Sequence, residues 1–412
     1  MIKPGQITGV SIKNQTGRIS VLINNKSGLS YFIGFLINLP MLPAILGFDI
    51  SGVSVIYIIS LVLFVIKMMV TPSSVKVSVI GVSLFLGFVI SFVLSFSFSD
   101  YTDYANYKFA FFFVKCVTLF TVGILASYNI YSFFKGYFHS IVIVATIALA
   151  QFYMHSIMSG LGFSISNRLE VGSVNPIWLS RLLTEAFLCI LIFSLNRKYL
   201  ALAFFIGLPS VLLSGSKGPV LALFISLFYR LKNIDKRKLI FFSFMVIALL
   251  IIFINSFASS EVQEFFQQRF LRVVPDTVGS DDIANSRSAI WLHSLQLVFS
   301  NAALFFQGVG VGNAYLVVFD SPIRFYPHNI FIEILLENGF TSLLLFVTTV
   351  TCAFLKARRS YWMPLFIFHV VNALFSGDII QNEKLFLFIG LAFSSAVYVK
   401  RTLNGQIYYV NK

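Results

Sequence analysis

Charged residues are scarce in this chain of 412 residues. They make up 11% of it, whereas soluble globular domains carry about 25%. Hydrophobic residues account for 58%, and the mean hydropathy is +0.87. This composition excludes an ordinary water-soluble enzyme, a disordered chain and a coiled coil. It predicts an all-α protein, a bundle of helices that cross a membrane many times.

Cysteines and clustered metal ligands are also scarce. The three cysteines all lie within apolar runs, so we expect small buried side chains rather than disulfides. The sequence shows no Cys/His spacing of the kind that binds a metal ion. Its densest carboxylates, at Asp281–Asp282 and at Asp100 and Asp103, read as solvated loop charges. We therefore predict no bound metal and no cofactor.

Long apolar runs take the place of charge. About 20 apolar residues cross the roughly 30 Å hydrocarbon core of a bilayer. On this basis we predict about twelve transmembrane helices, at residues 29–46, 53–70, 77–98, 109–130, 138–157, 176–195, 199–213, 218–231, 239–257, 340–356, 361–376 and 385–400. They divide the chain into five parts: an N-terminal segment at residues 1–28, helices 1–9 at 29–257, a large loop at 258–339, helices 10–12 at 340–400 and a tail at 401–412.

The remaining charges predict the orientation in the membrane. If the N-terminus is cytoplasmic and the sides alternate, cytoplasmic segments collect 20 of the 30 Lys and Arg residues. The same segments hold one of the 16 acidic residues, Asp235. This asymmetry is what the positive-inside rule describes, and it places both termini in the cytoplasm. The basic balance is thus explained by the lipid bilayer, and we expect no nucleic-acid partner.

The loop at residues 258–339 is too long for a simple connection, and loops of this length are usually functional or disordered. Its many aromatic residues argue against disorder. A short helix is predicted at 330–338, with Asn329 as its N-cap and Gly339 at its C-terminal stop. This helix is too short to span a bilayer, so we expect it to lie against the external membrane face.

Ionisable residues at membrane depth are costly and are therefore candidate sites. Arg181 and Glu185 lie four residues apart and share a helix face. They form either a mutually neutralising pair or a cavity lining in which the cation binds an anionic substrate. Lys115 either joins the same cluster or extends its side chain from near the end of its helix.

Two further segments carry candidate chemistry. The turn Ser214–Pro219 is either a plain external hairpin or an anion site, where Lys217 adds charge to a helix N-terminus. In the large loop, His328 stands at the start of the short helix, and Glu333 and Glu337 form the polar stripe of that helix. A lone histidine is usually structural, but this combination on one external helix favours a functional role.

These residues carry a resemblance to a known family. His328, Asn329, Glu333, Glu337 and Gly339 form a run that resembles the O-antigen polymerase and O-antigen ligase superfamily of membrane glycosyltransferases. Upstream parts of the same likeness are the motif Ser286-Arg287-x-x-x-Trp291, the glycine turn at 308–312 and the Lys217 turn. The hydropathy profile of the whole chain and the long external loop are also similar, with the specific motifs confined to about 175–340.

The resemblance implies a GT-C-like glycosyltransferase of the bacterial inner membrane, acting at the periplasmic face on undecaprenyl-diphosphate-linked oligosaccharide, with a chain-length regulator protein as a partner. It implies that Lys217, Arg287 and His328 line the reaction site. The family commonly has arginine where this chain has Lys217, and lysine lacks the planar two-pronged grip on phosphate oxygens.

The residue types fit that chemistry. Expelling a diphosphate requires fixed cations, here Arg287 and Lys217 with Arg181 as a further candidate, and a neutral His328 can serve as base near pH 7. Glu333 and Glu337 can orient that base or replace it.

Three functions compete on this evidence. We favour an O-antigen polymerase, which joins lipid-linked repeat units, on the strong Phe and Ile bias and the modest size of the loop. A ligase that moves finished polymer onto lipid A-core shares the same motifs. A flippase for the lipid-linked unit is disfavoured, because transporters carry charges through several midplane helices, whereas polar residues here crowd one external loop.

The predicted topology can be tested by cysteine labelling. In a variant without native cysteines, Asp282→Cys should react with a membrane-impermeant maleimide in cells whose outer membrane is permeabilised. Lys236→Cys, which the charge pattern places in the cytoplasm, should react only after the inner membrane is lysed. The opposite result would invert the topology.

Overall fold

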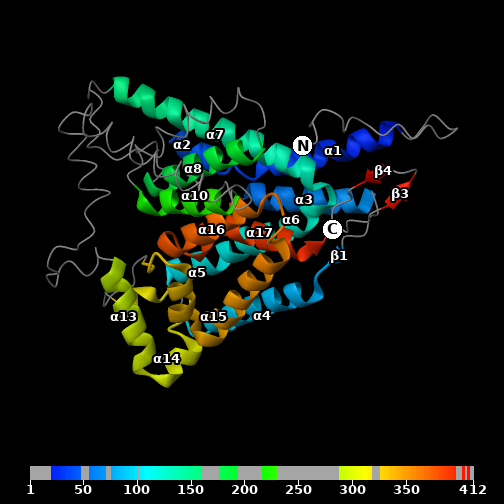
Figure 1. Cartoon of the computed structure of the whole chain (residues 1–412). Helices are drawn as coiled ribbons and strands as arrows, with labels where there is room; N and C mark the ends of the chain where they lie inside the picture. The colour runs from blue at the N-terminus through cyan, green and yellow to red at the C-terminus, as the bar shows by residue number, and fades with distance from the viewer. Residues whose placement is uncertain are drawn as a thin grey trace.

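The computed structural model describes residues 20–47, 55–70, 76–100, 102–158, 176–193, 216–230, 287–317, 325–395, 401–403 and 406–408. Figure 1 shows these elements as a bundle of helices. The α-helices are α1 Ser20–Leu36, α2 Met41–Ile45, α3 Val55–Val70, α4 Val79–Phe96, α5 Asp103–Phe111, α6 Thr118–Ala126, α7 Ile130–Met158, α8 Pro176–Phe193, α10 Lys217–Arg230, α13 Arg287–Ser300, α14 Ala302–Gln307, α15 Ile330–Ala357, α16 Met363–Phe375 and α17 Glu383–Phe393.

Shorter elements complete the described chain. A π-helix, η1 Phe112–Val117, joins α5 to α6 in one continuous rod. The 3-10 turns are η2 Ser127–Asn129, η5 Ala314–Val317 and η6 Ile379–Gln381. Two small antiparallel ribbons pair β1 Lys76–Val77 with β2 Ser394–Ser395, and β3 Arg401–Leu403 with β4 Gln406–Tyr408.

The described helices are those of a multi-pass membrane protein, although five rather than twelve are long and apolar enough to span a bilayer. These five are Gly28–Ile45, Val79–Phe96, Asp103–Ala126, Ile130–Phe152 and Ile330–Ala357. Shorter apolar helices, Val55–Ile66 and Met363–Phe375, cover two further predicted spans. The last predicted helix, 385–400, ends as α17 at Phe393, where the chain turns into β2. The predicted helices 199–213 and 239–257 and the loop residues 258–286 lie outside the described residues.

Glycines bring two helix pairs into close contact. A Cβ atom on Gly123 of α6 would overlap the Leu387 carbonyl oxygen of α17, and one on Gly390 of α17 would overlap the Phe120 carbonyl oxygen. In the same way, Gly34 of α1 packs against the backbone of α7, and Gly136 of α7 packs against the backbone of α1. Small residues that allow backbones to approach are typical of helix packing in membranes, where lipid is as apolar as the side chains.

Helices α16 and α17 lie in the middle of the bundle, between α10 on one side and α5 and α15 on the other (Figure 1). Almost every residue of α17 is buried. Phenylalanines fill the space around this layer: the rings of Phe92 and Phe112 stack at 4.0 Å and those of Phe85 and Phe120 at 3.7 Å between centroids. The abundant phenylalanine of the sequence therefore forms the core between α4, α6, α15 and α17.

The start of α15 matches the sequence prediction closely. Asn329 caps it, since its side-chain oxygen accepts hydrogen bonds from the backbone N–H of Phe331 and of Ile332. Gly339 breaks the helix with φ 76° and ψ 178°, so a short first segment precedes the membrane-spanning one. The predicted glycine turn packs against this kink: the N–H of Val309 donates to Leu336 O at 2.8 Å, and a Cβ on Gly308 would overlap the Glu337 carbonyl. The kink and the turn thus hold the first segment of α15 in place.

Candidate functional site

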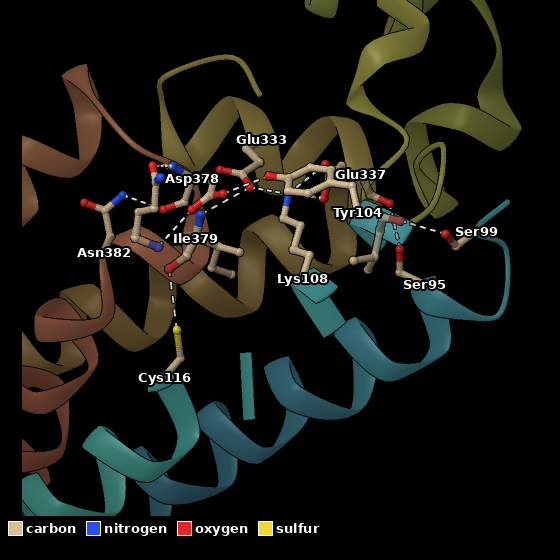
Figure 2. A network of polar contacts seen from close by, with 12 residues as sticks. Ser95, Ser99, Tyr104, Lys108, Cys116, Glu333, Glu337, Asp378, Ile379 and Asn382 are labelled. Atoms are coloured by element: carbon tan, nitrogen blue, oxygen red, sulfur yellow. Dashed lines mark hydrogen bonds and ion pairs between the residues drawn. The ribbon is translucent and has the colours of Figure 1, made fainter. Parts of the chain in front are cut away.

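A buried ion cluster joins α5 to the first segment of α15 (Figure 2). Lys108 points from α5 to both Glu333 and Glu337 of α15, and its Nζ lies 2.6 Å from Glu337 Oε2. All three side chains are almost fully buried. A buried charge is costly unless it is paired, so each carboxylate requires the shared ammonium. The predicted polar stripe of this helix is therefore not a solvated face but an interior contact.

The ion cluster continues into the connection between α16 and α17. Glu333 Oε1 accepts a hydrogen bond from the backbone N–H of Ile379 at 3.2 Å. The neighbouring Asp378 accepts one from the Tyr104 hydroxyl at 2.8 Å and caps η6 through the backbone N–H of Gln381. Figure 2 shows Asp378 and Ile379 beside the glutamates. Residues 376–382 are thus held from α5 and α15 at once.

The sequence prediction missed Lys108, because it started the transmembrane helix at residue 109 and left Lys108 in an external loop. The structure starts α5 at Asp103, six residues earlier, and buries Lys108. Lys115 was predicted either to join the Arg181–Glu185 cluster or to extend its side chain from near the end of its helix; its Nζ lies 5.5 Å from the centre of the Phe111 ring, and its side chain is half-buried. The signal available in the sequence was the helix start itself, with Thr102 as N-cap and Asp103 in the first turn.

Arginines gather at the C-terminal end of α16. Arg181 of α8 donates through Nη2 to the backbone oxygens of Asn372, at 2.9 Å, and Ser376. Arg287, the first residue of α13, donates through Nη1 to Phe375 O at 2.7 Å. The last carbonyls of a helix lack partners within the helix and carry its negative dipole end, so cations are favoured there.

Lys217 lies beside the same end of α16. It opens α10, and a Cβ on the next residue, Gly218, would come within 3.2 Å of Phe375 Cβ. Both Lys217 and Arg287 are exposed, whereas Arg181 is 8% exposed. The structure therefore brings together three of the predicted cations, from α8, α10 and α13, around one helix terminus.

The proposed pairing of Arg181 with Glu185 is not found. Among the described residues, Glu185 instead contacts Lys384 of α17 at 2.8 Å and His369 of α16 at 3.3 Å, and accepts a hydrogen bond from Tyr137. A spacing of four residues places two side chains on one face, but tertiary partners on α16 and α17 compete successfully for both. These partners lie more than 180 residues away in the sequence.

His328 has an unusual backbone and a sheltered side chain. Its φ of 59° makes it the one non-glycine with a left-handed backbone in the described part of the chain. Such a conformation costs about 1–2 kcal/mol and is often found at functional sites. The indole N–H of Trp291 donates to Pro327 O at 2.8 Å, so α13 holds the segment that carries His328. Its Nδ1 is buried with no hydrogen-bond partner among the described residues.

The surroundings of His328 keep its imidazole neutral. Partial burial lowers its pKa to about 4, and the positive charges of Arg287 and Arg181 act in the same direction, while Asp378 opposes them. Arg287 lies four residues before Trp291 on α13, so the segment that carries His328 lies against the same helix start as this arginine. A neutral imidazole can accept a proton at pH 7.

Among the described residues, no group of three or more His, Cys, Asp or Glu side chains is placed to hold a metal ion. Asp100 accepts a hydrogen bond from the Tyr315 hydroxyl at 2.7 Å. Asp281 and Asp282 lie outside the described residues. The site as described consists of cations, a neutral histidine and helix termini.

Comparison with known families bears on this set of residues. Residues 201–347 match a protein-family model described as O-antigen ligase. The match covers 147 of the 412 residues, and over this stretch the chain is similar to an O-antigen ligase domain. The resemblance to the O-antigen polymerase and ligase superfamily is thereby confirmed. No curated protein matches the chain. The O-antigen ligase domain contains Lys217, Arg287, His328, Glu333 and Glu337, whereas Lys108, Arg181 and Asp378 come from elements outside it.

Removal of the central cation should destabilise the protein strongly. Lys108→Met leaves two buried carboxylates without a partner, which typically costs about 3–5 kcal/mol. We expect a clear fall in the melting temperature of the detergent-purified protein. Lys115→Met is the matched control, since that lysine lies on the same rod and has no buried carboxylate partner among the described residues, and the melting temperature of this variant should change little.

Adding Glu333→Gln and Glu337→Gln to Lys108→Met removes all three charges and should restore most of the lost stability. A Lys108→Met variant that melts like the wild type would show that the ion cluster does not hold α5 and α15 together.

Proposed function

We propose that the protein is an O-antigen, or similar surface-polysaccharide, polymerase. It would transfer a growing undecaprenyl-diphosphate-linked glycan onto the next lipid-linked repeat unit. The observation that supports this most strongly is the gathering of Arg181, Lys217, Arg287 and His328 around the C-terminal end of α16. The match to the O-antigen ligase family supports a glycosyltransferase of the polymerase or ligase type.

The cations suit the leaving group of this reaction. A lipid diphosphate carries several negative charges when it departs, and fixed guanidinium and ammonium groups stabilise that charge as it develops. Arg287 and Lys217 are exposed at helix N-termini, where backbone N–H groups add to the positive potential. We propose that these two residues bind the diphosphate and that the buried Arg181 adds its positive charge to the site.

His328 suits the role of general base. In the transfer, the acceptor hydroxyl oxygen forms a bond to the anomeric carbon, and the bond from that carbon to the diphosphate oxygen breaks. The lipid diphosphate leaves with the electron pair, and the hydroxyl proton passes to the neutral imidazole. The left-handed backbone of His328 and its contact at 4.6 Å with the Tyr326 ring fix the orientation of the imidazole.

Donor binding should raise the basicity of His328. In the free protein the arginine charges help to lower its pKa to about 4, which makes a weak base. A diphosphate bound between Arg287 and His328 offsets that positive charge and stabilises the imidazolium. The base would thus become stronger only when the donor is in place.

We assign Glu333 and Glu337 a positioning role rather than that of the base. Both are committed to Lys108, and Glu333 also holds the backbone of Ile379. Their pairing fixes the helix that follows His328 and the connection that carries Asp378.

The proposal includes the setting of the reaction. We place the protein in the bacterial inner membrane with about twelve helices in a GT-C-like arrangement, both termini in the cytoplasm and the site at the periplasmic face. In support, seven helix ends meet at the candidate site: the starts of α5, α8, α10, α13, α15 and α17 and the end of α16. The charge pattern puts these same ends on the external side. A chain-length regulator is the expected protein partner.

The lipopolysaccharide of a deletion strain tests the function. Core bearing a single repeat unit identifies a polymerase, because transfer to core continues without chain growth. Bare core with accumulated lipid-linked polymer identifies a ligase, the second candidate, which the family match supports equally. The absence of any periplasmic lipid-linked sugar would identify a flippase and overturn both.

Arg287→Ala should abolish polymer formation while the protein stays in the membrane. Loss of one charge-assisted contact to a developing diphosphate costs about 3 kcal/mol, roughly a hundredfold in rate. Arg287→Lys should recover part of this, because the charge survives without the bidentate geometry. Arg230→Ala is the control, an exposed arginine at the far end of α10. A normal polysaccharide ladder from Arg287→Ala would remove this residue from the site.

His328→Ala should lower turnover about 10²–10⁴-fold with donor binding nearly unchanged. For the wild type, both kcat/KM and kcat should decrease as the pH is lowered. The decrease in kcat/KM follows the low pKa of free His328. The decrease in kcat should begin at a higher pH, because bound diphosphate raises the pKa of His328. In vitro polymerisation with lipid-linked repeat unit, normalised to folded protein, measures both. His293→Ala on α13 should behave as wild type. More than about a tenth of the normal rate in His328→Ala would exclude it as the base.

A further inference from the structure

A polar cavity lies between α8, α16 and α17, next to the arginine cluster at the end of α16. Its volume is about 30 Å³, more than the roughly 10–15 Å³ that one water requires, and enough for a small substituent but not for a whole sugar ring. Trp178, His369 and Gln381 line it and are partly exposed, so a group of a larger molecule can reach it.

Three polar atoms of the residues lining this cavity have no hydrogen-bond partner among the described residues. They are Arg181 Nε, a donor, and Asn372 Oδ1 and Glu383 Oε2, both acceptors. All three residues are more than nine-tenths buried. An unpaired buried polar atom is costly, so a group that both donates and accepts hydrogen bonds here gains free energy by pairing with these atoms.

The charges of the cavity select against an ion. Arg181 and Lys384 are balanced by Glu185 and Glu383. An anion would face two carboxylates, and a cation would face the guanidinium and the ammonium. An apolar group would leave the three polar atoms unpaired. A hydroxyl can pair with two of the three atoms at once, because it donates to Asn372 Oδ1 or Glu383 Oε2 and accepts from Arg181 Nε.

Arg181 connects this cavity to the proposed reaction centre. Its Nη2 holds the carbonyls at the end of α16, where Arg287 is also bound. Its charge reaches His328 and Tyr326. A molecule bound at Arg287 could therefore place a substituent next to Arg181.

We propose that this cavity is a sugar subsite, which takes a hydroxyl-bearing substituent of a neutral glycosyl residue in the lipid-linked substrate. The inference rests on the proposed function and goes beyond it, since it assigns sugar recognition to Arg181, Asn372 and Glu383, residues from outside the O-antigen ligase domain. Different residues then bind the diphosphate and the sugar.

Two probes separate these contributions: undecaprenyl diphosphate without sugar, and the lipid-linked repeat unit extracted from the deletion strain. Binding of each to the full-length protein in nanodiscs is measured. The wild type should bind the repeat unit more tightly. Glu383→Gln, which keeps the size of the side chain and an acceptor for the Tyr57 hydroxyl, and Asn372→Leu should each weaken repeat-unit binding about tenfold and leave the sugar-free lipid unchanged.

Asn313 provides a matched control for Asn372. Each donates through Nδ2 at 2.9 Å to the carbonyl four residues earlier, and each has an Oδ1 without a partner in the described structure, but Asn313 lies outside the cavity. Asn313→Leu should cost similar stability and leave the preference for the repeat unit intact. Should Asn372→Leu fail to fold, Glu383→Gln decides the question.

The outcomes are distinct. If both cavity variants keep the wild-type preference for the repeat unit, the subsite is wrong and the cavity holds water only. The proposed function then still stands, provided that Arg287→Ala weakens both lipids. If the wild type binds neither lipid, the proposed function fails, and the subsite fails with it.

Discussion

The arrangement of the site depends on a single ammonium group. Lys108 is paired with two carboxylates that lie more than 220 residues later in the chain, in an interior where none of the three charges can be left alone. The cluster fixes α5 against the first segment of α15. Through the hydrogen bond from Ile379 to Glu333 it also fixes the connection between α16 and α17. The ion cluster thereby also helps to hold the C-terminal end of α16, which binds the arginines.

The end of α16 explains how arginines can be kept ready for an anion. Carbonyl oxygens are weak, uncharged acceptors, so they orient Arg181 and Arg287 without neutralising them. An anion bound there would bring negative charge to groups that are already in place, so little free energy would be lost to reorganisation. The O-antigen ligase domain provides Arg287 and His328, while α5, α8, α16 and α17 provide the frame around them.

Local features of the fold were predictable from the sequence, whereas tertiary partners were not. Asn329 as N-cap, the break at Gly339 and the glycine turn follow from rules that act within a few residues. Lys108 was missed because the helix begins six residues before the predicted boundary, which moves this residue from loop to core. Arg181 and Glu185 were recognised as buried charges, but their partners, including Lys384 and the end of α16, depend on packing between distant segments.

The π-helix at Phe112–Val117 has a consequence for how this chain tolerates changes in length. A π-helical turn accommodates one residue more than an α-helical turn, so it is the natural product of a single-residue insertion. Removing one residue from this π-helical turn returns the rod to an α-helix. Lys108 before the turn and Gly123 after it then still point toward the same neighbouring helices. Elsewhere in the rod, a one-residue deletion rotates everything beyond it by about 100° and separates Gly123 from Leu387. Length variants within this rod should therefore be confined to these six residues.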